Sequence, residues 1–239
     1  MIGHSRDAND LALSRARIYH LLGTAHIKPH DSGFLRLLGG WVAAQAGGQF
    51  QLPSEQMKQG LSMLHHFFEN MGQDYSAKFE ELVATEFTRL FRGVKPLYSP
   101  LPPYESVYRE EAGRVFSQST SEVRQVYRRF GFDLAEGFGG EPPDHVSFEL
   151  EFVGLLCGRE AEAWRENDED AACQYQLAER DFVTEHLLTW LPQLCGEIRR
   201  HDRLGLFHGI ADLTEGWVIF DYSENLQGLS YFAAGTAAV

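Results

Sequence analysis

The hydrophobic residues of this chain recur with the three-to-four-residue spacing of helices over much of its length. One such run occupies residues 76–93, where apolar side chains keep this spacing for more than three turns: Phe79, Leu82, Val83, Phe87, Leu90 and Phe91. Ser76 can cap the start of this helix, and Gly93 can close its end in a left-handed turn. The pattern therefore predicts a helix over residues 76–93.

Two further segments have the same spacing and recognisable ends. Residues 119–131 begin with Ser119-Thr120-Ser121-Glu122, the sequence of a capping box, and end at Gly131. Residues 144–157 are apolar on more than one face, and a helix of this kind is surrounded by other helices. We expect this second helix to be central. The spacing predicts additional helices over residues 11–22, 33–46, 61–70, 172–191 and 204–213.

Prolines separate these helices, and signals for strands are scarce. The prolines between the helices are Pro96, Pro100, Pro102, Pro103, Pro142 and Pro143, whereas residues 104–141 and 144–191 have none. No β-branched run alternates with polar residues, and only residues 217–222 are short and apolar enough to be extended. We predict an all-α protein, a single helical bundle of about ten helices with a hinge or loop near residues 131–143.

Composition and charge narrow the classes of protein. The 239 residues are 44% hydrophobic and 23% charged, which is typical of a folded domain, and 34 acidic against 21 basic residues give a net charge of −13. Such a charge disfavours nucleic acid and favours a cationic partner. No apolar run is long enough to cross a bilayer, and the first residues lack the apolar segment of a secretory signal. These features predict a cytoplasmic protein without stable membrane insertion.

The cysteines and histidines do not have the spacing of a metal site. Cys157, Cys173 and Cys195 form no C-x-x-C pair, so we expect buried free thiols rather than a disulfide framework. The ten histidines include no H-E-x-x-H, and Pro29 separates His26 from His30. The acidic residues 160–170 are expected to be a solvated connection between two helices, with a recognition patch as the alternative.

Motifs of nucleophilic catalysis or nucleotide binding are absent from the sequence. It has no G-x-S-x-G elbow, no Walker A loop and no G-x-G-x-x-G after a strand. Residues 137–140 are glycine-rich, and we expect them to form a sharp bend between helices, with phosphate binding as the alternative.

Two other segments are candidates for function. Phe87, Leu90 and Phe91 share a helical face, which is typical of a core, and the proline-rich loop that follows contains tyrosines suited to a peptide. In the second segment, residues 141–145, Asp144 suits a helix N-terminus. Alternatively, Asp144 and His145 bind a cation or guanidinium, or couple the turn to histidine protonation. An acid–base pair of a helical hydrolase is a further alternative, but no nucleophile accompanies it.

These two segments resemble the signatures of the TorD-like family of redox-enzyme maturation chaperones, which includes the DmsD and NarJ types. The aromatic-x-x-Leu-Phe element matches Phe87-x-x-Leu90-Phe91, and the Glu-Pro-x-Asp-His element matches Glu141-Pro142-x-Asp144-His145. The stretch Pro103-Tyr104-Glu105-Ser106-Val107-Tyr108 is similar to the family's loop between them. Agreement is strongest over residues 87–152 and extends over residues 15–213.

The resemblance implies a cytoplasmic chaperone and not an enzyme. Such a protein binds the N-terminal leader, often of twin-arginine type, of a molybdoenzyme catalytic subunit, and holds the client back from export until its cofactor is inserted. The family also implies weak GTP binding, no other cofactor, and a monomer or a domain-swapped homodimer. The alternative function is an all-α protein that binds GTP or a small molecule through residues 137–145.

The resemblance also divides the chain and assigns its residues. A chaperone domain over residues 1–225 would comprise an N-terminal part (1–131), a hinge (132–143) and a C-terminal part (144–225), followed by a tail over residues 226–239 that frays. Phe87 and Pro142 are expected to give structural support. The residues expected to bind the peptide are Leu90, Phe91, Pro103, Tyr104, Glu105, Ser106, Tyr108, Glu141, Asp144 and His145.

From these residues we expect a particular mode of binding. Leu90, Phe91 and Tyr104 would form an apolar groove for the hydrophobic part of the leader. Glu141 and Asp144 would pair with its arginines, and the acidic surface would accelerate the encounter in a manner that salt weakens.

Overall fold

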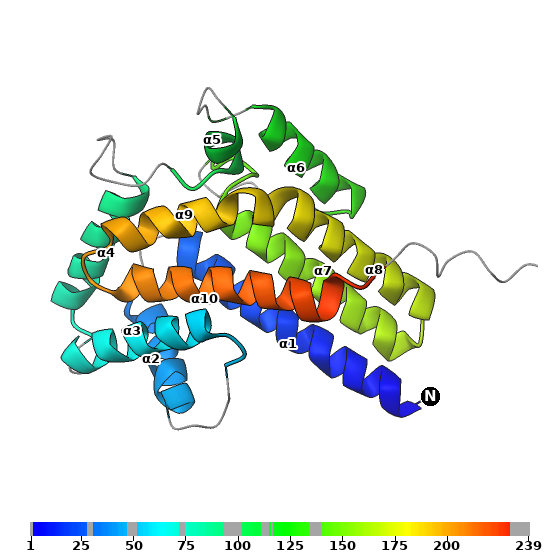
Figure 1. Cartoon of the computed structure of the whole chain (residues 1–239), viewed down its shortest axis with the longest axis horizontal. Helices are drawn as coiled ribbons and strands as arrows, with labels where there is room; N and C mark the ends of the chain where they lie inside the picture. Colours follow the sequence, from blue (N-terminus) through cyan, green and yellow to red (C-terminus); the bar gives the residue numbers. More distant parts are fainter. Residues whose placement is uncertain are drawn as a thin grey trace, which may run out of the picture.

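The chain folds into a bundle of helices (Figure 1). This computed structural model describes residues 2–27, 31–46, 52–71, 75–92, 102–110, 115, 117–133 and 140–229, with side chains from residue 6 onwards and excluding that of residue 46. The helices are α1 (Ile2–Ile27), α2 (Ser32–Ala46), α3 (Glu55–Met71), α4 (Ala77–Phe91), α5 (Glu105–Arg109), α6 (Gln118–Arg129), α7 (Val146–Glu166), α8 (Glu169–Phe182), α9 (Leu188–His201) and α10 (Leu206–Asp221). Two π-helical turns, η1 (Val183–Leu187) and η2 (Tyr222–Leu226), follow α8 and α10. Within the described ranges there is no strand beyond one bridge between Tyr104 and His145, so the all-α prediction is confirmed.

Helix α7 is the central helix, as its two apolar faces predict. It packs along α1 on one side and α8 on the other (Figure 1). Gly154 allows the close approach of α1, because a Cβ atom there would lie 3.2 Å from the Cβ of Tyr19 and 3.3 Å from the carbonyl oxygen of Ala16. Leu150, Val153 and Leu156 are fully buried.

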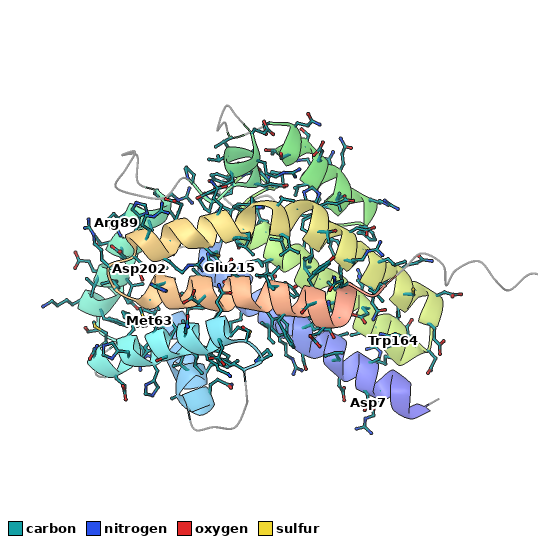
Figure 2. All side chains as sticks on the ribbon, in the orientation of Figure 1. Asp7, Met63, Arg89, Trp164, Asp202 and Glu215 are labelled. Carbon is teal, nitrogen blue, oxygen red and sulfur yellow. The ribbon has the colours of Figure 1, made fainter. Side chains whose placement is uncertain are left out.

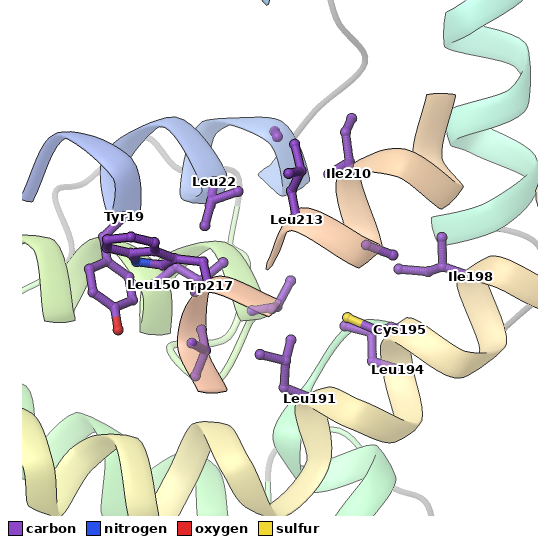
Figure 3. Close-up of a cluster of buried hydrophobic side chains, with 14 of the residues drawn as sticks. Tyr19, Leu22, Leu150, Leu191, Leu194, Cys195, Ile198, Ile210, Leu213 and Trp217 are labelled. Atoms are coloured by element: carbon purple, nitrogen blue, oxygen red, sulfur yellow. The ribbon is translucent and has the colours of Figure 1, made fainter. Parts of the chain in front are cut away.

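The core continues between α9 and α10. Leu191, Leu194, Cys195 and Ile198 of α9 face a cluster that includes Ile210, Leu213 and Trp217 of α10 and Leu22 of α1 (Figure 3). All three cysteines are free thiols, as predicted, but only Cys157 and Cys195 are buried, and Cys173 is partly exposed. Burial raises the pKa of Cys157 and Cys195.

Helices α3 and α10 cross at two glycines. A Cβ atom on Gly209 would lie 2.7 Å from Cγ of Leu64 and 2.8 Å from the carbonyl oxygen of Gly60. These distances are shorter than ordinary van der Waals contact, so the crossing requires residues without side chains at both positions.

A cluster of four ionisable side chains connects α1 with α7, α8 and α10. Arg15 donates hydrogen bonds to Glu160 (2.9 Å), to Glu179 (2.6 Å) and to Asp221 (2.6 Å), and all four residues are buried. We call them the Arg15 cluster. Glu160 lies in the segment expected to be a solvated connection. This expectation holds for the turn at Asn167 but is wrong for Glu160, which belongs to the core.

Three other sequence predictions need correction. Residues 217–222 are helical rather than extended. The capping box of α6 is formed by Ser117 and Thr120, two residues before the predicted start. Residues 172–191 are not one helix that stops at Pro192, because Pro192 lies inside α9. The preceding π-helical turn, in which the amide of Leu188 donates to the carbonyl of Val183, changes the hydrogen-bond register just before this proline.

Parts of other predictions lie outside the described residues: Gly93, the loop over residues 94–101, residues 134–139 of the predicted hinge, and residues 230–239 of the predicted tail. The proposed domain boundaries therefore stay predictions. Among the helices that the structure describes, none combines the length and the apolar composition that crossing a bilayer requires.

Candidate functional site

The two segments that share the family signatures lie against each other. The amide of Glu105 donates to the carbonyl of Asp144 (2.9 Å), and the amide of Val146 donates to the carbonyl of Pro103 (3.0 Å). Oδ2 of Asp144 accepts a third bond from the amide of Ser106 (3.0 Å). These bonds hold residues 103–106 on residues 141–145, which we call the acidic turn.

Inside the acidic turn, His145 rather than Asp144 caps helix α7. Its Nδ1 accepts a hydrogen bond from the amide of Ser147 (3.1 Å), and its ring makes an edge contact with Tyr104 at 5.3 Å. Burial lowers the pKa of His145 to about 3, with smaller contributions from His26 and Arg92. The imidazole is therefore neutral at ordinary pH and serves as a buried cap.

Beneath the turn lies a second group of buried carboxylates. Glu105 accepts a hydrogen bond from Nδ1 of His186 (3.0 Å) and pairs with Arg109, and Glu149 accepts one from Nε1 of Trp190 (3.1 Å). Burial, and then the neighbouring Glu105, raise the pKa of Glu149. Glu105 is one of the residues predicted to bind the peptide, but in this structure its side chain is fully buried.

The groove expected around Leu90, Phe91 and Tyr104 is not open in this structure. Leu90 has no exposed area, and Phe91 packs on Phe87 (4.7 Å between ring centroids) and on Phe207 (5.7 Å). Pro103, Ser106, Pro142 and Asp144 are buried as well. The sequence pattern identified residues that meet in space, but most of them form the inside of the site. Whether they contact a peptide stays a prediction.

The outer edge of the turn carries Glu141. Its side chain, 14% exposed, forms an ion pair with Arg92 at the end of α4 and accepts a hydrogen bond from the hydroxyl of Tyr104. The Arg92 side chain is 47% exposed. Of the other predicted residues, Tyr108 is half-buried against Trp190. Glu141 and Glu105 thus both hold a guanidinium, but of the two only Glu141 has exposed side-chain area.

The position of α4 is fixed from its other side. Arg89 of α4 and Asp202, which follows α9, lie at the same end of the bundle (Figure 2). Glu86 accepts hydrogen bonds from Arg89 (2.5 Å) and from the amide of Arg203 (2.8 Å), and Arg89 donates to the carbonyl of His201. These bonds hold α4, the helix that Arg92 directly follows.

A groove with a volume of about 470 Å³ lies beside the acidic turn, between α1 and α7. Its lining residues are His20, Thr24, Ile27, Tyr127, Phe132, Asp133, Ser147, Phe148, Glu151, Phe152 and Leu155. We call it the α1–α7 groove. It was missed at the sequence level, because the second apolar face of α7, with Phe148, Phe152 and Leu155, was interpreted only as a sign of burial.

The described residues give little evidence for a metal-binding or nucleotide-binding site. Cys157, Glu160 and Glu179 place donor atoms within 4.8 Å of one another, but Arg15 already binds both carboxylates, and Trp164 and Gln176 bind the other oxygen of Glu160. Residues 137–139 of the predicted nucleotide-binding turn lie outside the described residues. The predictions of no metal and of weak GTP binding therefore stay predictions.

Comparison with known proteins finds relatives whose names agree with one another. The perchlorate reductase assembly chaperone protein of Dechloromonas aromatica is 28% identical over 232 residues, which are 92% of this chain and 94% of the relative. The chaperone proteins TorD of Vibrio parahaemolyticus and Photobacterium profundum are 29% and 28% identical, over 55% and 58% of this chain. The matches span 58% and 62% of those two relatives. These names are those of chaperones and assembly proteins, in agreement with the prediction that the chain is not an enzyme.

A solved structure and a family model complete the comparison. A redox enzyme maturation protein of Archaeoglobus fulgidus has a TM-score of 0.37 and 19% identity, over 70% of this chain and 96% of that one. A family model described as nitrate reductase delta subunit matches residues 51–196. Since this match covers more than half of the residues, the chain belongs to the nitrate reductase delta subunit family, which contains the TorD-like redox-enzyme maturation chaperones.

Proposed function

We propose that this protein is a maturation chaperone that binds the N-terminal leader, of twin-arginine type, of a molybdoenzyme catalytic subunit. It would retain that subunit in the cytoplasm until its cofactor is inserted. Membership of the family and the names of the relatives support the general role of chaperone. The leader as the bound segment is our own step, and it rests on the acidic turn.

The observation that carries this proposal is the guanidinium held by Glu141. Arg92 pairs with this carboxylate, and the hydroxyl of Tyr104 donates to it from the other side. A carboxylate with a fixed orientation is suited to the planar fork of an arginine. Because Arg92 is half-exposed, and exposed ion pairs contribute only about 0–1 kcal/mol, an arginine of the leader can displace it at little cost.

The buried residues of the site have a supporting role in this proposal. Ser106 and Asp144 fix the loop to the turn, His145 caps α7, and Leu90 and Phe91 anchor the end of α4 in the core. Together they set the distance between Arg92 and Glu141. Most of the predicted peptide-binding residues would thus not contact the leader. They would instead hold the carboxylate of Glu141, which faces the leader, in position.

The net charge of −13 acts at longer range. A negative surface attracts a dibasic leader and raises its association rate, and salt screens this attraction over about 8 Å at physiological ionic strength. Binding should therefore weaken as the salt concentration increases.

The test is a fluorescence anisotropy titration of the full chain with a synthetic twin-arginine leader peptide at two salt concentrations. Glu141→Gln should weaken binding by up to about fivefold, because an ion pair of this exposure contributes at most about 1 kcal/mol. Arg92→Ala should tighten binding, because it removes the competing guanidinium.

A matched control is Arg165→Ala, since Arg165 is also exposed and paired with one carboxylate, Glu166, at 3.6 Å, and lies outside the site. It should leave the affinity unchanged. Absence of leader binding by the unmodified chain would overturn the proposal, and GTP binding without leader binding would favour the nucleotide-binding alternative.

A further inference from the structure

The α1–α7 groove is an apolar surface with acidic edges. Its apolar lining consists of Ile27, Phe132, Phe148, Phe152 and Leu155. Leu155 is 46% exposed, and Ile27 and Phe132 are partly exposed, so this surface is accessible from solvent. An accessible apolar groove of this size can take several side chains of one face of a helix.

The wall of the groove is rigid. The ring of Phe152 packs on Tyr127 (4.6 Å between centroids), on Phe132 (5.7 Å) and on Phe182 (4.8 Å). Tyr127, Phe152 and Phe182 belong to α6, α7 and α8, and Phe132 follows α6, so the groove does not depend on a single segment. Its shape is present before any partner binds, which reduces the entropic cost of binding.

The residues that line the groove include two carboxylates, those of Glu151 and Asp133, and no lysine or arginine. Glu151 pairs with the largely exposed His20 at 2.8 Å, and Asp133 is paired with Arg128 at 3.8 Å. One further cation faces this region: Arg159 lies over the ring of Phe132 at 6.0 Å and is itself paired with Glu162. An apolar helix with flanking basic residues complements such edges, whereas an acidic helix would be repelled.

The groove and the acidic turn are physically continuous. The hydroxyl of Tyr127, which lines the groove, donates to the carbonyl of Pro143 in the turn (3.0 Å). Ser147, which also lines the groove, donates its amide to His145 (3.1 Å). The groove and the acidic turn are therefore neighbours in the fold.

We infer that the α1–α7 groove binds the apolar segment that follows the arginines of the client leader. This inference rests on the proposed function. The twin-arginine part would pair with Glu141 on the acidic turn, and the apolar helix after it would lie in the α1–α7 groove, with its flanking basic residues near Glu151. Continuity with the turn and the acidic edges favour this occupant over a second copy of this chain, which carries excess negative charge.

The test uses two exposed aliphatic residues in helices. Leu155→Asp places a carboxylate in the groove, and Ile219→Asp places one at a position of α10 that is 44% exposed and outside the groove. Circular dichroism should show that both variants fold, because neither side chain is buried. Leader affinity should fall about tenfold or more for Leu155→Asp, because burying a charge against apolar atoms is costly, and remain unchanged for Ile219→Asp.

Two peptides separate this inference from the proposed function. A short peptide with the arginines but without the apolar segment should bind the unmodified chain and Leu155→Asp equally. Equal affinity of the full leader for both variants would refute the groove as the binding site of the apolar segment and leave the proposed function intact. No binding of either peptide to the unmodified chain would overturn both. If light scattering showed that Leu155→Asp removes a dimer and leaves leader affinity unchanged, the groove would be an interface between copies.

Discussion

Replacing Glu179 by glutamine is expected to stabilise the protein above neutral pH. Glu179 is fully buried in the Arg15 cluster, where the described residues place one guanidinium against three carboxylates. Burial raises the pKa of Glu179 to about 8, although Arg15 opposes the shift; Glu160 adds to it. Glutamine keeps the shape of this side chain and an acceptor for Arg15 but cannot ionise.

The magnitude follows from the difference in proton binding between the folded and unfolded states. The pKa of Glu179 is about 8 when folded and 4.5 in the reference state, so between these values the folded chain holds a proton that the unfolded chain does not. Its contribution to stability is complete below pH 4.5 and is lost as pH rises through 8, by about 1.4 kcal/mol per pH unit. Between pH 6.5 and 8 the variant should therefore gain about 2 kcal/mol relative to the unmodified chain.

The assay is urea denaturation followed by circular dichroism at pH 6.5, 7.25 and 8. The matched control is Glu162→Gln on α7, because Glu162 is 52% exposed and pairs with Arg159 on the surface. Its difference from the unmodified chain should not change with pH. A constant difference for Glu179→Gln would refute the reasoning, because it would mean that Glu179 stays ionised beside Arg15.

Two further changes test the packing and the cap. Gly209→Ala should destabilise the protein by about 1–3 kcal/mol in urea denaturation, since its Cβ would meet Leu64 at 2.7 Å. Gly158→Ala, where a Cβ has no neighbour within 4 Å, should stabilise by up to about 1 kcal/mol; equal effects of both substitutions would contradict the packing argument. The low pKa of His145, about 3, means that its contribution to stability is lost as pH falls below 6.5. His145→Asn, which can still cap α7, should reduce this loss by about 1.4 kcal/mol per pH unit in acid denaturation. If stability falls with pH in the same way in both proteins, His145 is protonated in the folded state.

Local patterns predicted the helices well. The spacing in residues 76–93 gave α4 (Ala77–Phe91) nearly to the residue, and the two apolar faces of residues 144–157 gave a central helix. Helix α9 was harder, because a proline normally ends a helix, and the π-helical turn that precedes Pro192 leaves no signal in the spacing of apolar residues.

The site was only partly predictable, because its charges are paired over long distances in sequence. The signatures located the loop and the turn, and the backbone bonds between Glu105 and Asp144 bring them together. Nothing near Glu105 in the sequence reveals that its partner is His186, 81 residues further on. A charged residue in a proline-rich loop is usually exposed, so only the structure shows that Glu105 is buried.

The Arg15 cluster has a consequence for how the protein is made. The ribosome adds residues in order, and the partner of Arg15 that is synthesised last, Asp221, follows 206 residues after it. During translation of all the intervening chain, this guanidinium lacks one of its acceptors. Helix α1 emerges before the other described helices but is among the last of them to reach its final electrostatic environment, and folding can be complete only after Asp221 has left the exit tunnel.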